Sequence, residues 1–130
     1  MKMSEQHDVE ANRELVLRFY QALERGDFSL EGILFDESYK QHSVMAGDGV
    51  KGLKEMAAWM AKEWPDRKLT IHQTICEGDK VACHVHFERW PGDPGLAAVD
   101  IFRVENGKVV EHWDVVQEIP TEFKHNNGMF

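Results

Sequence analysis

Two aspartates stand in stretches of the sequence that are otherwise apolar. Asp100 lies in AAVDIFRV and Asp114 in VVEHWDVV, where Val, Ile, Phe and Trp predominate. A carboxylate among apolar residues costs free energy unless it is paired or protonated, because burial favours the uncharged acid. A carboxyl group held in an apolar pocket can therefore act as a general acid or base near neutral pH. The alternative for each acid is a structural ion pair or an exposed strand face.

The two aspartates lie on opposite arms of a predicted β-hairpin that runs from Ala97 to Gln117. Between the arms stands Asn106-Gly107, a dipeptide that tolerates the positive φ angles of a two-residue turn. Counting outward from this turn places Asp100 opposite Trp113, one residue from Asp114. Because a slip of one residue turns a strand over, the prediction is limited to the two acids lying close together.

Alternation with period two indicates which side chains accompany each acid. Phe102 shares a face with Asp100, and His112 shares a face with Asp114. We therefore expect these four side chains to line one substrate pocket. Tyr20, earlier in the chain, could add a phenol hydroxyl, although a tyrosine at helical spacing also suits a core position.

Three helical segments are predicted before residue 65. Apolar residues at spacings of three and four predict an amphipathic helix from about Asp8 to Arg25, which Gly26 ends. A shorter helix, capped by Asp27, is predicted to end near Asp36. A second amphipathic helix is predicted from Val50 to Glu63.

The helix from Val50 to Glu63 carries side chains that could form an adaptable pocket lining. The candidates are Met56, Trp59 and Met60, since methionine side chains adjust to irregular apolar shapes. The alternative is that they simply pack on a sheet. The two interpretations are compatible, because a residue in a pocket wall can also pack on the sheet.

After Pro65 the periodicity becomes alternating and predicts four strands that follow the helices. The first two run from Lys68 to Glu77 and from Lys80 to Trp90, and the hairpin supplies the other two. Along the second strand, His84 and His86 share one face, so both are candidates for the pocket lining.

Histidines raise the possibility of a metal site. His42 lies just before Gly47-Asp48-Gly49, a loop signal where the mouth of a pocket could form, and His84-x-His86 has ligand-like spacing on a strand. Because no third ligand stands at a defined spacing, we predict no metal and no cofactor. Metal binding through His42, His84 and His86 is the alternative.

Length and composition narrow the choice of partner and compartment. With 130 residues, 42% hydrophobic and 29% charged, the chain fits a single globular domain, 1–130, that needs no disulfide or metal to hold its core. A net charge of -8 without a cluster of Lys and Arg argues against nucleic acid. No apolar run suits a membrane span or a signal peptide, so we expect a cytoplasmic protein with no membrane contact.

Three stretches carry a resemblance to a known family. They are RFYQALERGD in the first helix, YKQHSVMAGDGVKGLKEM in the middle and VDIFRVENGKVVEHWDVVQEIP in the hairpin. Over nearly its whole length the chain resembles the SnoaL-like branch of the nuclear transport factor 2-like superfamily. The resemblance implies an α+β fold, a cone-shaped α+β barrel whose curved antiparallel sheet wraps around N-terminal helices. It also implies an open end that takes a small apolar molecule, and a homodimer formed through the outer sheet face.

The resemblance assigns roles to particular residues. Asp114, in EHWD, matches the acid/base aspartate of SnoaL-type cyclases, which close rings by an aldol reaction without a cofactor. Asp100 falls where those cyclases carry a histidine and where the ketosteroid isomerase carries a protonated, oxyanion-binding aspartate. His42 falls near the isomerase's base, and Phe19, not Tyr20, falls at the position of its oxyanion tyrosine.

Two functional hypotheses follow. In the first, the chain is a SnoaL-like enzyme: Asp114 removes a proton next to a carbonyl group, and Asp100, with His42 or a water molecule, stabilises the enolate oxygen. Aldol closure, isomerisation and dehydration all share this first step. In the second, the chain is a binding or dimerisation module without catalytic activity, and the two acids form structural ion pairs with histidine or arginine side chains.

Overall fold

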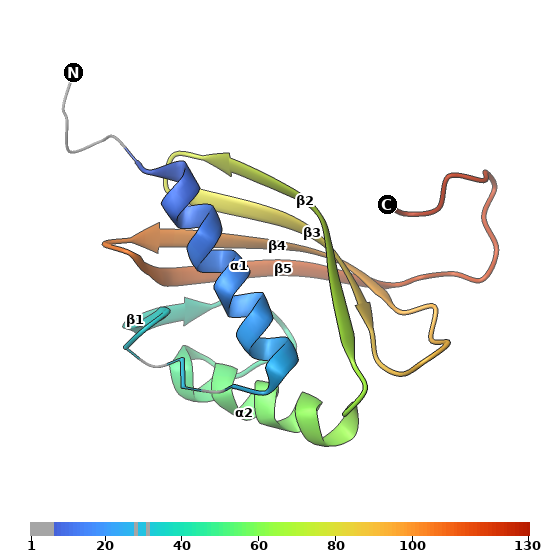
Figure 1. Ribbon diagram of the computed structural model, residues 1–130, viewed down its shortest axis with the longest axis horizontal. Coiled ribbons are helices and arrows are strands. Elements are labelled where there is room, and N and C mark those ends of the chain that lie inside the picture. The colour runs from blue at the N-terminus through green and yellow to red at the C-terminus, as the bar shows by residue number, and fades with distance from the viewer. Residues whose placement is uncertain (1–6, 28, 31) are drawn as a thin grey trace.

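The computed structural model describes residues 7–27, 29–30 and 32–130 of the chain. Within these residues, two helices pack on one side of a curved sheet of five strands (Figure 1). In chain order the elements are α1 (Val9–Arg25), β1 (Phe35–Gln41), α2 (Gly49–Glu63), β2 (Lys68–Glu77), β3 (Lys80–Glu88), β4 (Leu96–Glu105) and β5 (Lys108–Glu118).

The strands are arranged in the order β1-β5-β4-β3-β2. This confirms the predicted α+β cone with two differences: the sheet is open rather than a closed barrel, and it is mixed because β1 runs parallel to β5. The other neighbouring strands are antiparallel. Among the described residues, neither helix is long and apolar enough to cross a membrane.

Helix α1 begins and ends where the sequence predicts. The side chain of Asp8 accepts a hydrogen bond of 3.0 Å from the backbone N–H of Ala11 and so caps the helix. Gly26 ends it with a φ of 76°, a left-handed conformation that glycine adopts without a steric penalty. The apolar face of α1 is buried, through Leu15, Val16, Phe19, Tyr20, Ala22 and Leu23.

Helix α2 confirms the second amphipathic helix. It starts at Gly49, one residue before the predicted start, and the side chain of Asp48 accepts a hydrogen bond from the Gly49 N–H at 2.9 Å. Trp64 follows its last residue. The side of α2 that faces the interior contacts β1 and follows helical spacing, through Val50, Leu53, Ala57 and Met60.

The predicted short helix from Asp27 to Asp36 is wrong. Instead of capping a helix, the Asp27 side chain accepts hydrogen bonds from the backbone and the hydroxyl of Ser29, a local turn that competes with a helix start. Residues 32–34 form a turn. The segment also contains Phe28 and Glu31, which lie outside the described residues.

Strand β1 is an element that the sequence does not predict. Its sequence, FDESYKQ, lacks the alternation of a half-buried strand, because its two aromatic residues stand four positions apart with polar residues between them. In the structure these two residues, Phe35 and Tyr39, are buried. Their rings lie 4.7 Å apart within the aromatic core. Because β1 pairs in parallel with β5, Gln41 lies beside His112.

The β4–β5 hairpin has the predicted turn, with φ angles of 51° at Asn106 and 74° at Gly107. Farther from the turn, the predicted pairing of Asp100 with Trp113 is wrong. Asp100 instead lies directly opposite Asp114.

A β-bulge explains this change of register. Val104 pairs with Val109, but Arg103 pairs with Glu111, so Val110 is an extra residue in β5. The extra residue shifts the pairing by one position for the rest of the hairpin. Both acids therefore project from the same, inner face of the sheet.

Candidate active site

An apolar pocket lies between the two helices and the inner face of the sheet. Its cavity volume is about 80 Å³, several times the space that one water molecule needs. Three methionines among its walls can adjust their shape to a ligand. The apolar lining consists of Phe19, Leu23, Met45, Leu53, Met56, Met60, Trp64, Leu69, Val85, Phe87, Leu96, Ala98, Phe102 and Val116.

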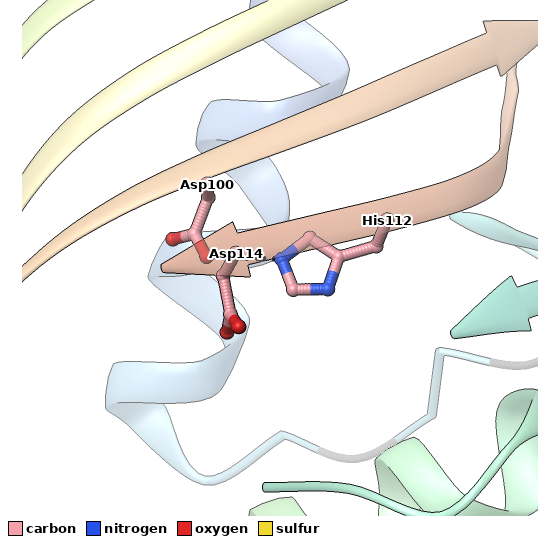
Figure 2. A group of neighbouring side chains, drawn as sticks. All are labelled: Asp100, His112 and Asp114. Carbon is pink, nitrogen blue, oxygen red and sulfur yellow. Dashed lines mark hydrogen bonds and ion pairs between the residues drawn. The ribbon is translucent and has the colours of Figure 1, made fainter. Parts of the chain in front are cut away.

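Two aspartates and a histidine form the polar end of the pocket. Asp100 comes from β4, and His112 and Asp114 come from β5. One carboxylate oxygen of each aspartate and one ring nitrogen of the histidine all lie within 4.8 Å of one another. Figure 2 shows the two carboxyl groups close together, with the His112 ring turned toward them. The two acids therefore lie close together, as the hairpin predicts.

Asp100 is held through both of its carboxyl oxygens. The hydroxyl of Tyr20 donates a hydrogen bond to Oδ2. The other oxygen, Oδ1, lies 2.9 Å from Nε2 of His112, and these two side chains are 14% and 10% exposed. Although the resemblance places Phe19 at the oxyanion tyrosine, the hydroxyl that reaches the acid belongs to Tyr20, and Phe19 forms part of the apolar wall.

Residues at the end of β1 support the polar end from the other side. Oε1 of Gln41 lies 2.7 Å from Nδ1 of His112, and Nε2 of Gln41 donates to the Tyr39 hydroxyl at 2.6 Å. The Ser43 side chain also interacts with Asp114 and lowers the pKa of its carboxyl group. The sequence-based prediction omits Gln41 and Ser43 because it contains no strand here. Their spacing of two residues suits one face of an extended segment, but the residues around them lack the apolar alternation that would indicate a strand.

Burial controls protonation in the pocket. It raises the pKa of Asp114, an effect that the Ser43 side chain opposes and the charge of Asp100 strengthens. Burial also raises the pKa of both Tyr20 and Tyr39, so the two phenols keep their protons at neutral pH. The polar end thus combines neutral hydroxyl donors with a carboxyl group of increased basicity.

His42, a predicted catalytic residue, lies outside the pocket. Its ring stacks on Trp113 with ring centres 5.0 Å apart, and its Nε2 lies 2.7 Å from Oε2 of Glu111. Alternation along the extended backbone explains this position, because Gln41 and Ser43 on either side face the polar end.

His84 and His86, two predicted pocket residues, lie on the outer face of the sheet. They alternate along β3 with the buried Val85 and Phe87, which take the inner face. The ring of Phe130 packs against both histidines, with ring centres 4.8 and 4.9 Å apart. The strand was predicted correctly, but the face that points inward was not.

Of the other six predicted pocket residues, five line the pocket and one does not. Tyr20, Met56, Met60 and Phe102 line the pocket together with His112. Trp59 does not, because it lies on the solvent side of α2. It is 49% exposed, and its ring packs edge-on against Trp64 at 4.9 Å.

The alternative metal site of His42, His84 and His86 does not form. Within the part of the chain that the structure describes, the histidine and acidic groups whose potential ligand atoms converge are Asp100, His112 and Asp114. Both ring nitrogens of His112 already have hydrogen-bond partners, in Gln41 and Asp100. A metal ion at this group would have to replace the contact between His112 and Asp100.

A family model identifies the family of the chain, and solved structures share its fold. The family model described as SnoaL-like polyketide cyclase matches residues 14–123. TsrD from Streptomyces laurentii has a TM-score of 0.74 at 22% identity, over 85% of this chain and 91% of that one. A proposed polyketide cyclase from Bacillus cereus has a TM-score of 0.72 at 26% identity, over 82% and 74%. IdmH from Streptomyces antibioticus has a TM-score of 0.69 at 21% identity, over 85% and 92%. No curated protein sequence matches the chain.

Proposed function

Because the chain belongs to the SnoaL-like polyketide cyclase family, we propose that it is an enzyme that acts on a small apolar carbonyl compound by general acid and base catalysis, without a cofactor. The observation that carries this proposal is the pair of carboxyl groups, Asp100 and Asp114, at the polar end of an otherwise apolar pocket. The reaction is an aldol ring closure, an isomerisation or a dehydration, since all three begin with the same proton transfer.

Asp114 is the base in this proposal. Its carboxylate takes a proton from the carbon next to the substrate carbonyl. The electrons of that C–H bond form a carbon–carbon double bond, and the carbonyl oxygen becomes an enolate. Burial supports this role because it raises the pKa of Asp114, and the carboxylate of a weaker acid is a stronger base.

Asp100 and His112 stabilise the enolate oxygen. A proton held between Oδ1 of Asp100 and Nε2 of His112 can move toward that oxygen as negative charge develops on it. Among the described residues that line the pocket there is no lysine or arginine, so the site suits an uncharged substrate. The narrow space also favours a small or flat molecule.

Ligand binding and proton exchange together test the proposal. The full chain is screened by thermal shift against small apolar ketones and aldehydes, because a compound that binds only the folded protein raises its melting temperature. Each hit is then incubated in deuterium oxide, and loss of its α-proton NMR signal is followed. We expect at least one compound that both binds and exchanges. Hits that bind without any exchange would replace the enzyme with the non-catalytic binding module.

We also propose that the chain forms a homodimer through the outer face of its sheet. Apolar side chains are exposed there, with Ile75 64% exposed, Val99 43% and Val115 76%. Such exposure on one face is typical of an association surface. The substitution Val115→Lys is expected to turn the dimer into a monomer in sedimentation velocity. The control Val44→Lys, at a fully exposed position outside the strands, should leave the dimer intact, and a wild type that sediments as a monomer would refute the proposal.

A further inference from the structure

The side-chain amide of Gln41 has its orientation determined by a backbone group. The N–H of Ser43 lies 3.0 Å from one amide atom of Gln41, and a backbone N–H can only donate a hydrogen bond. That atom must therefore be the oxygen, Oε1. The amide nitrogen then points the other way and donates to the Tyr39 hydroxyl at 2.6 Å, so both ends of the amide are satisfied.

The amide oxygen in turn determines where His112 carries its hydrogen. Nδ1 of His112 lies 2.7 Å from Oε1 of Gln41, and an amide oxygen can only accept. The contact therefore requires a hydrogen on Nδ1. A neutral imidazole carries one hydrogen on its two ring nitrogens. With that hydrogen on Nδ1, neutral His112 presents the lone pair of Nε2 to Asp100.

We propose that Gln41 is a positioning residue that keeps the hydrogen of His112 on Nδ1 and thereby makes His112 and Asp100 retain one shared proton. Oδ1 of Asp100 lies 2.9 Å from Nε2, and without a proton between them two lone pairs would face each other at hydrogen-bond distance. With that proton, the pair is a protonated acid beside a neutral imidazole, or a carboxylate beside an imidazolium. Both forms have the same net charge.

The groups around this pair are consistent with one retained proton. They are the phenols of Tyr20 from α1 and Tyr39 from β1, the thiol of Cys83 from β3 and the carboxyl of Asp114 from β5. Burial raises the pKa of the Cys83 thiol to about 12, and it raises the pKa of both phenols, so these three groups stay neutral. None supplies a positive charge that could replace the shared proton.

The catalytic consequence rests on the proposed function. If Asp114 removes a proton from the substrate, the pair of His112 and Asp100 is the store from which a proton reaches the enolate oxygen. Gln41 does not line the pocket, so it acts through His112 rather than on the substrate. It differs in this respect from Asp100 and Asp114, which line the pocket.

Ring-nitrogen NMR of the ¹⁵N-labelled full chain tests the inference without a substrate. Near pH 7 we expect the wild-type His112 to carry its hydrogen on Nδ1. In Gln41→Leu the acceptor at Nδ1 is lost, so the ring should release its Nδ1 hydrogen to solvent and keep the other hydrogen on Nε2, where the carboxylate of Asp100 accepts it. In Gln41→Glu a carboxylate still accepts from Nδ1, so the wild-type pattern should be kept.

The outcomes separate the inference from the proposed function. A wild-type His112 with no hydrogen on Nδ1, or an unchanged pattern in Gln41→Leu, would overturn the inference. His84 on β3, whose ring packs against Phe130 on the outer face, serves as the internal reference whose ring signals should not move in either variant. If the tautomer shifts as expected but no carbonyl compound exchanges its α proton, the proposed function fails and the inference stands. With an exchanging substrate, Gln41→Leu should lower kcat and leave KM nearly unchanged.

Discussion

Replacing Asp114 with asparagine is expected to slow α-proton exchange by about 100-fold or more, because the amide cannot accept a proton from carbon. The effect should appear in kcat, while substrates still raise the melting temperature of the variant. The apolar walls that bind the substrate are unchanged by the substitution. The measurement is the NMR exchange rate of a bound carbonyl compound, compared between the wild type and Asp114→Asn at equal occupancy.

The stability of Asp114→Asn distinguishes a catalytic from a structural acid. Burial raises the pKa of Asp114 in the folded state above its usual value of 3.8, so folding loses stability as the pH rises through the interval between the two pKa values. At neutral pH the carboxylate therefore opposes folding, and asparagine should leave the free energy of unfolding equal or higher. A structural ion-pair partner would instead lose about 3–5 kcal/mol.

An exposed aspartate provides the matched control. Asp66 lies in the turn between α2 and β2 and is exposed. Asp66→Asn makes the same chemical change away from the pocket, so exchange rate and urea unfolding should both match the wild type. If Asp114→Asn exchanges protons as fast as Asp66→Asn, Asp114 is not the base.

The second large effect is expected on stability, from Asp93→Asn. Asp93 lies in the loop between β3 and β4, and its side chain is 1% exposed. Its two oxygens accept hydrogen bonds from Nε and Nη2 of Arg89 at 2.7 and 3.0 Å, and from the backbone N–H groups of Arg89 and Gly95 at 3.0 and 3.1 Å. Asparagine would place an amide N–H₂ against these donors and leave the guanidinium without its buried counter-charge. We expect a loss of about 3 kcal/mol, measured by urea unfolding at neutral pH.

The pH dependence gives this prediction a sign. Hydrogen bonds from the Arg89 side chain lower the pKa of Asp93 from 3.8 to about 2. A carboxyl group with a lowered folded-state pKa stabilises the fold above its unfolded-state pKa, and this contribution is lost as the pH falls from about 4 to about 2. The wild type should therefore lose stability over this interval more steeply than Asp93→Asn. Equal slopes, or a neutral-pH loss below about 1 kcal/mol, would show that the pair contributes little.

The proposed catalytic residues and the proposed dimer contacts lie on opposite faces of the sheet. The inner face carries Asp100, His112 and Asp114 at the end of the pocket. The outer face carries the exposed apolar residues Val99 and Val115 on the same two strands. Substitutions that alter association should therefore leave the pocket side chains in place, so catalysis and dimerisation can be tested separately.

Local patterns in the sequence were sufficient to predict most of the helices and strands. The helical spacing and the Asp8 cap predict α1, and the alternation around Gly78 and around Asn106-Gly107 predicts β2 to β5 closely. These features depend on residues a few positions apart, whose conformations and capping bonds are decided within the segment itself. The two carboxyl groups on one hairpin could be predicted for the same reason.

The composition of the site was decided by contacts between distant parts of the chain. Strand β1 forms because Phe35 and Tyr39 pack into an aromatic core and β5 offers a parallel edge, and neither partner can be read from FDESYKQ. The contact between Gln41 and His112 joins residues 71 positions apart. No local pattern encodes such a pairing.

Tertiary contacts also determined the strand register and the face of the sheet on which each side chain lies. Period-two alternation shows that His84 and His86 share a face, but whether that face meets the helices depends on which side of the sheet they cover. Here the helices cover Val85 and Phe87. The bulge at Val110 likewise places Asp100 opposite Asp114 and not Trp113. The sequence by itself therefore determined the chemical groups and their strands, while packing of the helices on the curved sheet determined which groups meet in the pocket.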